Sequence, residues 1–140
     1  MTSKSGTRVT MAIYDAFERG DVSAVLAQLD SAVEWRLAEG HQYSPEGKAW
    51  VGHTAIAENF FARAGADWDR FAVVPTRVHE AGDSVVVEVR YLGTFGPTGR
   101  DLDAQGCRVW TVHEGKVTAF QQYVDTSQLQ AVMTPRKETR

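Results

Sequence analysis

Apolar residues recur with helical spacing in three stretches of the first half of the chain. The first stripe runs from Val9 to Phe17, and Gly20 follows it where a left-handed helix end is expected. Asp21 offers a carboxylate that can cap a second short helix, and a third helix is expected from Thr54 onward. The three stripes are Val9, Ile13, Ala16 and Phe17; Val22, Val25, Leu26 and Leu29; and Ile56, Phe60 and Ala64.

The second half of the chain changes to a period of two, which is typical of β-strands separated by glycine-containing turns. A last helix carrying Leu129, Val132 and Met133 is expected after Thr126 or Ser127. This order of elements predicts an α+β fold with about five strands in a curved antiparallel sheet and the helices on one side of it. The expected strands cover residues 32–38, 71–81, 83–95, 107–113 and 116–125.

The turn between the last two strands sets their register. A two-residue turn would place Glu114 at positive φ, which glutamate disfavours, so we expect a three-residue loop over residues 113–115. That loop pairs Val112 with Lys116 and Arg108 with Phe120. One face then carries Arg108, Trp110, Val112, Phe120, Gln122 and Val124, and the other carries Cys107, Val109, Thr111, Val117, Ala119, Gln121, Tyr123 and Asp125.

Both predicted faces are substantially apolar, whereas a sheet with helices on one side should be polar on the other. The second face is therefore expected to meet another protein surface, most economically that of a second copy in a homodimer joined sheet to sheet. The alternative is a monomer whose C-terminal helix folds over that face.

Length and composition narrow the possible partners. The chain has 140 residues and a net charge of −3 with no basic patch, so nucleic acid is not an expected partner. No apolar run is long enough for a membrane span and no signal peptide is visible, so the cytoplasm is the expected compartment. Its single cysteine, Cys107, excludes an internal disulfide.

Four segments resemble the SnoaL-like group of the nuclear transport factor 2-like superfamily, which also contains ketosteroid isomerases. They are YDAFERGD (14–21), VEW (33–35), VGHTAIAENFF (51–61) and VWTVHEGKVTAFQQYVDT (109–126). The resemblance covers residues 9 to about 133, and we expect one domain over residues 7–133, with flexible polar ends at 1–6 and 134–140. It also implies a cone of curved sheet around three N-terminal helices, a short C-terminal helix and a dimer. Because this fold supports many activities, the resemblance says less about function.

The catalytic residues of the relatives do not carry over. The aspartate base of ketosteroid isomerases corresponds to Trp35, and their helix-1 tyrosine corresponds to Ile13, one residue before Tyr14. Their second aspartate, like the acid–base aspartate of SnoaL-type cyclases, corresponds to Arg108. Arginine cannot be deprotonated near neutrality, so neither mechanism transfers.

The same correspondence places a set of aromatic and apolar residues on the inner face, around a few polar groups, as is usual for a small-molecule pocket. The expected ligand-binding residues are Trp35, Val87, Tyr91, Trp110, Phe120 and Gln122. Val85 and Val89 share this face.

Arg108 has three interpretations. It can anchor a ligand oxyanion, form an internal ion pair, or face solvent. Asp125 ends the last strand on the outer face, and Asp-Thr-Ser before an apolar helix is more typical of a cap than of a catalytic base. For an internal ion pair the candidate partners are Glu34, Asp101, Asp103 and Asp125.

His41 and Tyr14 are the remaining candidates for proton transfer. His41 lies in a polar loop after the first strand, where this fold has its pocket mouth, and is either an acid–base group or an ordinary loop residue. Tyr14 is either a core tyrosine with a bonded hydroxyl or a pocket donor. No histidine spacing suggests a metal, and no motif suggests a nucleotide or other cofactor.

Two functions follow. The first is an isomerase-, cyclase- or lyase-type enzyme that moves protons or adds water on a hydrophobic ring-bearing or carbonyl metabolite. Arg108 would hold developing negative charge, and His41 or Tyr14 would move the proton. The second is a protein that binds or senses a small molecule without chemistry. A dimeric interaction module without a ligand is a third reading, and it requires a filled pocket.

Overall fold

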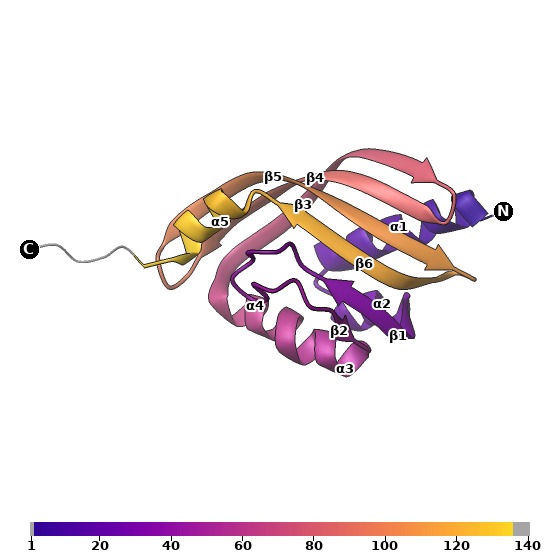
Figure 1. Ribbon diagram of the computed structural model, residues 1–140, viewed down its shortest axis with the longest axis horizontal. Helices are drawn as coiled ribbons and strands as arrows, with labels where there is room; N and C mark the ends of the chain where they lie inside the picture. Colours follow the sequence, from indigo (N-terminus) through magenta and orange to yellow (C-terminus); the bar gives the residue numbers. More distant parts are fainter. Residues whose placement is uncertain (1, 136–140) are drawn as a thin grey trace, which may run out of the picture.

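Six strands form one sheet in the order β2-β1-β6-β5-β4-β3, in a computed structural model that describes residues 2–135. The sheet is arched, and helices α1 to α4 lie on the side toward which it curves (Figure 1). The expected α+β architecture is therefore confirmed.

Of the two expected flexible ends, Met1 and residues 136–140 lie outside the described part of the chain. In chain order the elements are α1 (Thr2–Glu18), α2 (Val22–Ala27), β1 (Leu29–Arg36), β2 (Trp50–Val51), α3 (His53–Ile56), η1 (Ala57–Phe61), α4 (Ala62–Asp67), β3 (Trp68–Ala81), β4 (Ser84–Phe95), β5 (Arg100–His113), β6 (Lys116–Val124) and α5 (Thr126–Met133).

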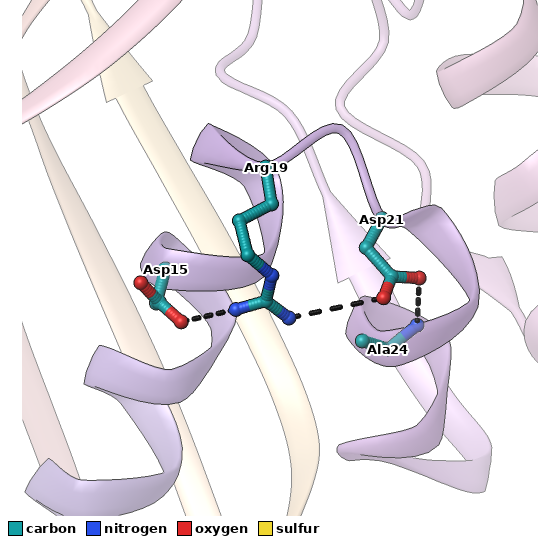
Figure 2. Close-up of polar contacts among 4 residues, drawn as sticks. All are labelled: Asp15, Arg19, Asp21 and Ala24. Atoms are coloured by element: carbon teal, nitrogen blue, oxygen red, sulfur yellow. Dashed lines mark hydrogen bonds and ion pairs between the residues drawn. The ribbon is translucent and has the colours of Figure 1, made fainter.

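Local capping signals define where the first two helices meet. Gly20 adopts a φ of 72°, the left-handed conformation expected at the end of α1. Asp21 then caps α2, because its carboxylate accepts a hydrogen bond from the backbone N–H of Ala24 at 3.0 Å. Figure 2 shows Arg19 between Asp15 and Asp21, and its guanidinium pairs with both carboxylates. These contacts are exposed and fix the junction rather than contribute much stability.

The third helix is longer and less regular than its apolar stripe predicts. It runs without a break from His53 to Asp67, through the π-helical segment η1. The wider π turn lets the adjacent residues Phe60 and Phe61 both reach Trp35, with ring centroids 6.1 and 5.5 Å from the indole. This helix therefore presents two consecutive aromatic rings to the sheet.

The turn between β5 and β6 differs from the prediction. Glu114 has a φ of 50° and Gly115 a φ of 79°, so these two residues alone form the turn and His113 pairs with Lys116. A two-residue turn of this kind matches the right-handed twist of the strands. That match outweighs the cost of holding Glu114 at positive φ. This cost was the reason for expecting a three-residue loop.

A bulge next to this turn restores most of the predicted face assignment. The register shifts between Thr111 and Val112, so that Trp110 pairs with Phe120 and Arg108 with Gln122. Arg108, predicted to pair with Phe120, is therefore displaced by two positions, but its side chain stays on the predicted face. Val117 was predicted on the outer face, and this is wrong: it lies before the bulge and is fully buried.

The strand β1 runs parallel to β6, with Trp35 beside Phe120, so the sheet is mixed rather than entirely antiparallel. No short turn joins β1 to β6, so their relative direction is not set by a hairpin. On its other side β1 pairs with the two-residue edge strand β2, which the sequence pattern did not predict.

The core lies between the concave face of the sheet and the helices. All the residues predicted to face inward from β4, β5, β6 and β1 are buried, except that Val124 is half-buried. The buried residues of this predicted set are Val85, Val87, Val89, Tyr91, Arg108, Trp110, Val112, Phe120, Gln122 and Trp35.

In the described part of the chain, no helix combines the length and apolar character needed to cross a membrane.

Candidate functional site

The centre of the concave face is packed with aromatic rings. Trp35 stacks on Phe120 with ring centroids 3.8 Å apart, and its ring edge meets Trp110 at 5.8 Å. Trp110 and Phe120 are 4.6 Å apart. Because Trp35, Trp110 and Val87 are all fully buried, these expected ligand-binding residues fill the centre of the fold themselves.

Arg108 projects from β5 into this aromatic environment and is only 3% exposed. Its Nε donates a hydrogen bond to the hydroxyl of Tyr91 at 3.0 Å. The guanidinium carbon also lies between 5.1 and 5.9 Å from four ring centroids, within the range of cation–π attraction. These rings belong to Tyr14, Tyr91, Trp110 and Phe120. Of the three interpretations of Arg108, the solvent-facing one is therefore wrong.

The internal ion pair is also wrong for the four expected partners, each of which is engaged elsewhere. Glu34 pairs with Arg36 at 3.3 Å, and Asp103 pairs with Arg90 at 2.7 Å. Thr94 donates to Asp101 at 2.7 Å. Asp125 caps α5 as expected, accepting from the backbone N–H of Gln128 at 3.1 Å.

Within residues 2–135, Arg108 is therefore a buried cation whose polar partners are tyrosine oxygens. Within residues 2–135 its Nη1 has no hydrogen-bond partner. Burial opposes the charge, but the oxygens of Tyr91 and Tyr14 favour it, and the net effect raises the pKa of Arg108 above its ordinary value. Burial in turn raises the pKa of Tyr91, although Arg108 opposes this, so the Tyr91 hydroxyl stays protonated at neutral pH.

Tyr14 has the surroundings of a core tyrosine with a bonded hydroxyl. Its oxygen accepts a hydrogen bond from the indole N–H of Trp110 at 3.2 Å, and the two rings meet edge to face. It is buried and close to Arg108. The N–H of Trp110 is thereby satisfied inside the protein.

A small hollow of about 20 Å³ remains beside the aromatic centre, which is room for about one water molecule. It lies between the loop after β1 and helix η1–α4 on one side, and the sheet on the other. Of the residues predicted for the site, His41, Tyr91 and Gln122 line it, whereas Trp35, Val87, Trp110, Phe120, Arg108 and Tyr14 do not. The other lining residues are Tyr43, Phe60, Ala64, Trp68, Phe71, Leu102, Val124 and Leu129.

Tyr91 and Gln122 connect the hollow to Arg108. The hydroxyl of Tyr91 accepts from Arg108, and Gln122 is the cross-strand partner of Arg108 on β6. Gln122 is itself held in place, because its Oε1 accepts from the backbone N–H of Ala38 at 3.3 Å. In this arrangement a molecule confined to the hollow is separated from the buried charge by these two side chains, so a ligand that contacts Arg108 must displace them.

His41 is buried in the wall of the hollow. Its Nδ1 accepts a hydrogen bond from the backbone N–H of Tyr43 at 3.0 Å, which assigns the proton of the neutral ring to Nε2. Burial, with a contribution from Arg63, lowers the pKa of His41 from 6.5 to about 4. His41 is therefore neutral at physiological pH, where it is a weak base but a competent hydrogen-bond donor.

Tyr43, which no sequence pattern singled out, holds the loop after β1 against helix α4 beside the hollow. Its hydroxyl donates to Asp67 of α4 at 2.6 Å, and the guanidinium of Arg63 lies 4.2 Å from the centre of its ring. Burial and the bond to Asp67 raise the pKa of Tyr43 well above its ordinary value. The sequence feature that could have indicated a role for Tyr43 is the presence of an aromatic residue within a polar, proline-containing loop.

Comparison with known proteins establishes the family. The model of the SnoaL-like domain matches residues 11–120, most of the chain, and the protein belongs to this family. An NTF2-like protein from Burkholderia thailandensis E264 is 30% identical, with a TM-score of 0.86 over 93% of this chain and 98% of the other. No curated protein matches the sequence.

Two further solved structures resemble this protein at 25% sequence identity, each with a TM-score of 0.81. One is TerC co-crystallized with polyporic acid, covering 91% of this chain and 97% of TerC. The other is a candidate polyketide cyclase from Xanthomonas campestris pv. campestris, covering 94% of this chain and 98% of that one. The SnoaL-like fold, similar to that of polyketide cyclases, indicates a small-molecule pocket protein.

Proposed function

We propose that the protein binds a small, hydrophobic, ring-bearing organic anion on the concave side of its sheet, with Arg108 supplying the positive charge. The observation that carries this proposal is the buried guanidinium of Arg108, with no carboxylate beside it in the described part of the chain. An unpaired buried charge is costly, so such a group is retained where a counter-charge arrives from outside. A ligand oxyanion is the partner that a guanidinium binds best.

The surroundings of Arg108 support a ring-bearing ligand. Aromatic side chains from both layers line the hollow, and Tyr91 and Gln122 add a hydroxyl and an amide between it and the charge. TerC, which is similar in fold, was co-crystallized with an acid. Because the hollow has room for about one water molecule, a ligand of this kind requires the side chains around it to move apart.

A second candidate function is an isomerase-, cyclase- or lyase-type enzyme acting on a ring-bearing or carbonyl substrate. The observation that favours it is the neutral imidazole of His41 in the wall of the hollow. With a pKa of about 4, His41 would polarise a carbonyl oxygen as a donor rather than remove a proton as a base. A role for Tyr14 in proton transfer stays a prediction, since Tyr14 does not line the hollow.

We also propose that the protein is a homodimer joined through the outer face of the sheet. Leu129 of α5 lines the hollow, so this helix closes one end of the concave side and leaves the outer face for a partner. Tyr123 stands 53% exposed on that outer face. The cytoplasmic compartment stays a prediction.

Calorimetric titration with matched ligands tests the binding proposal. The panel is benzoate, 2-naphthoate and 9-anthracenecarboxylate, each compared with its neutral carboxamide. We expect at least one carboxylate to bind about tenfold more tightly than its amide, since a charge-assisted bond adds roughly 1.5–3 kcal/mol. Arg108→Met should remove this preference, because it keeps an unbranched apolar side chain but no charge.

The matched control is Arg90→Met, which removes an exposed arginine from the adjacent strand β4. This variant should keep the preference for the carboxylate. A wild-type protein that binds no carboxylate of the panel more tightly than the corresponding amide would overturn the proposed function.

A further inference from the structure

Two buried side-chain donors lack a hydrogen-bond partner in residues 2–135, and both lie on the concave face. They are Nη1 of Arg108 and the indole Nε1 of Trp35. Folded proteins leave few buried donors unpaired, because each one forfeits the hydrogen bond it made to water. Trp110 shows the ordinary arrangement, since its indole N–H donates to Tyr14.

The two unpaired donors belong to one cluster. Trp35 comes from β1 and Arg108 from β5, on either side of β6. The Phe120 ring on β6 contacts both: its centroid lies 3.8 Å from that of Trp35 and 5.1 Å from the guanidinium carbon of Arg108. Trp110 also lies within 6 Å of both groups, at 5.8 and 5.9 Å. The two donors therefore share the same two aromatic neighbours.

We propose that Trp35 Nε1 is the second donor of the anion site, so that one oxyanion group of the ligand accepts hydrogen bonds from both Arg108 and Trp35. This inference rests on the proposed function and narrows the ligand class. An indole N–H and a guanidinium can donate but cannot accept. The group that satisfies both must therefore offer acceptor oxygens, and compensating the charge of Arg108 requires an anionic group such as a carboxylate or an enolate.

The same chemistry excludes other ligand groups from this subsite. A carboxamide oxygen can accept from both donors but carries no charge to compensate Arg108, and an ammonium group offers no acceptor and is repelled by Arg108. A single ether or ketone oxygen accepts from both donors but leaves the positive charge uncompensated. The rings of Phe120 and Trp110 favour a flat, conjugated body behind the oxyanion.

Trp35→Phe tests this inference, because phenylalanine keeps a flat ring against Phe120 and removes the indole N–H. In calorimetric titrations with the same carboxylates and amides, we expect this variant to bind the preferred carboxylate about tenfold more weakly. Its affinity for the matching amide should be unchanged. Trp50→Phe is the matched control: Trp50 lies on the edge strand β2, its ring is not among those around the Arg108 guanidinium, and its indole N–H is not one of the unpaired buried donors, so both affinities should stay as in the wild type.

A second measurement uses the unaltered protein. In a proton–nitrogen correlation spectrum, the indole N–H signal of Trp35 should move downfield as the carboxylate is added, and the signal of Trp110 should move less. This readout does not depend on how well the Trp35→Phe variant folds.

The outcomes separate the two proposals. If Trp35→Phe binds the carboxylate as tightly as the wild type while Arg108→Met loses the preference, the inference about Trp35 is wrong and the proposed function stands. Equal weakening of carboxylate and amide would make Trp35 a wall of the site rather than a donor, and would also overturn the inference. If the wild type shows no preference for carboxylates, both proposals fail.

Discussion

At the scale of single residues, Tyr91 reaches Arg108 through a space that a glycine leaves open. A Cβ atom at Gly106 would lie 2.2 Å from the Tyr91 ring and 2.6 Å from the carbonyl oxygen of Tyr123. Gly106 faces the concave side two positions before Arg108 on β5, so its missing side chain lets the Tyr91 ring lie against the strand. The hydroxyl can then accept the bond from Arg108. The polar environment of the charge thus depends on a residue that has no functional group.

His41 makes stability depend on pH with a definite sign. Its pKa is about 4 in the folded protein and 6.5 ordinarily, so between these values the unfolded chain binds a proton that the folded protein does not. The contribution of His41 to stability is therefore fully present above pH 6.5 and is lost as the pH falls toward 4, by a total on the order of 3 kcal/mol. Urea unfolding at several pH values across this window measures the slope.

His41→Asn should flatten this decline, because asparagine does not titrate and its side-chain oxygen can still accept from Tyr43. His113→Asn is the control, since that side chain is 68% exposed, and it should keep the wild-type slope. Equal slopes in the wild type and in His41→Asn would show that His41 is not the group responsible.

At the scale of secondary-structure elements, the β5–β6 hairpin and its bulge decide which side chains reach the concave face. The turn is as short as a hairpin allows, and β6 carries one extra residue, Thr118, between the partners of Thr111 and Val112. Without that extra residue, the two-residue turn would place Phe120 and Gln122 on the outer face. The bulge therefore keeps Gln122 beside Arg108 and the Phe120 ring beside Trp35.

Glu114 is the position at which this hairpin can be stabilised. Its φ of 50° suits asparagine better than glutamate, and Asn-Gly is the preferred pair for a turn with two positive φ angles. We expect Glu114→Asn to increase the free energy of unfolding by about 1 kcal/mol. Glu114→Gln removes the same charge without relieving the backbone, so it should change stability little. Thermal and urea unfolding compare the two, and equal effects would attribute the gain to charge rather than conformation.

At the scale of the whole molecule, the arched sheet has two different apolar faces. The concave face is covered by helices and holds the aromatic centre, the hollow and Arg108. On the outer face Val86 and Val109 are cross-strand partners, and each is half-buried. The described chain leaves this face without a covering layer, which is why we propose that a second copy covers it.

Val109→Glu tests the dimer by placing a charge at the centre of that face. If two copies meet there, the buried carboxylate should weaken their association by roughly a hundredfold or more, and sedimentation equilibrium should then show monomers at micromolar concentration. Val51→Glu is the control, because Val51 is 57% exposed on the edge strand β2, and this variant should remain dimeric. A wild-type protein that sediments as a monomer would contradict the dimer.

Periodicity along the chain was enough to predict much of this protein. The helices, most of the strands, and the caps at Asp21 and Asp125 follow from neighbouring residues, whereas the inward direction of Arg108 and Gln122 was taken from the family resemblance. Hydrophobic period, capping and side-chain alternation depend only on residues that are close together in the sequence, so they can be predicted from it. The family resemblance rests on the same local segments.

Other features depend on residues that are distant in the sequence. The parallel pairing of β1 with β6, the bulge that buries Val117, and the small volume of the hollow were not predicted. Nor could sequence choose between an ion pair and an unpaired cation at Arg108, because every candidate carboxylate had to be placed in space first. The sequence alone determined the alternation of side chains along the strands and, through the family resemblance, most of the inward set, but not Val117. Tertiary packing decided which of them find partners, because a hydrogen bond or ion pair depends on distances of a few ångströms that only the assembled sheet and helices define.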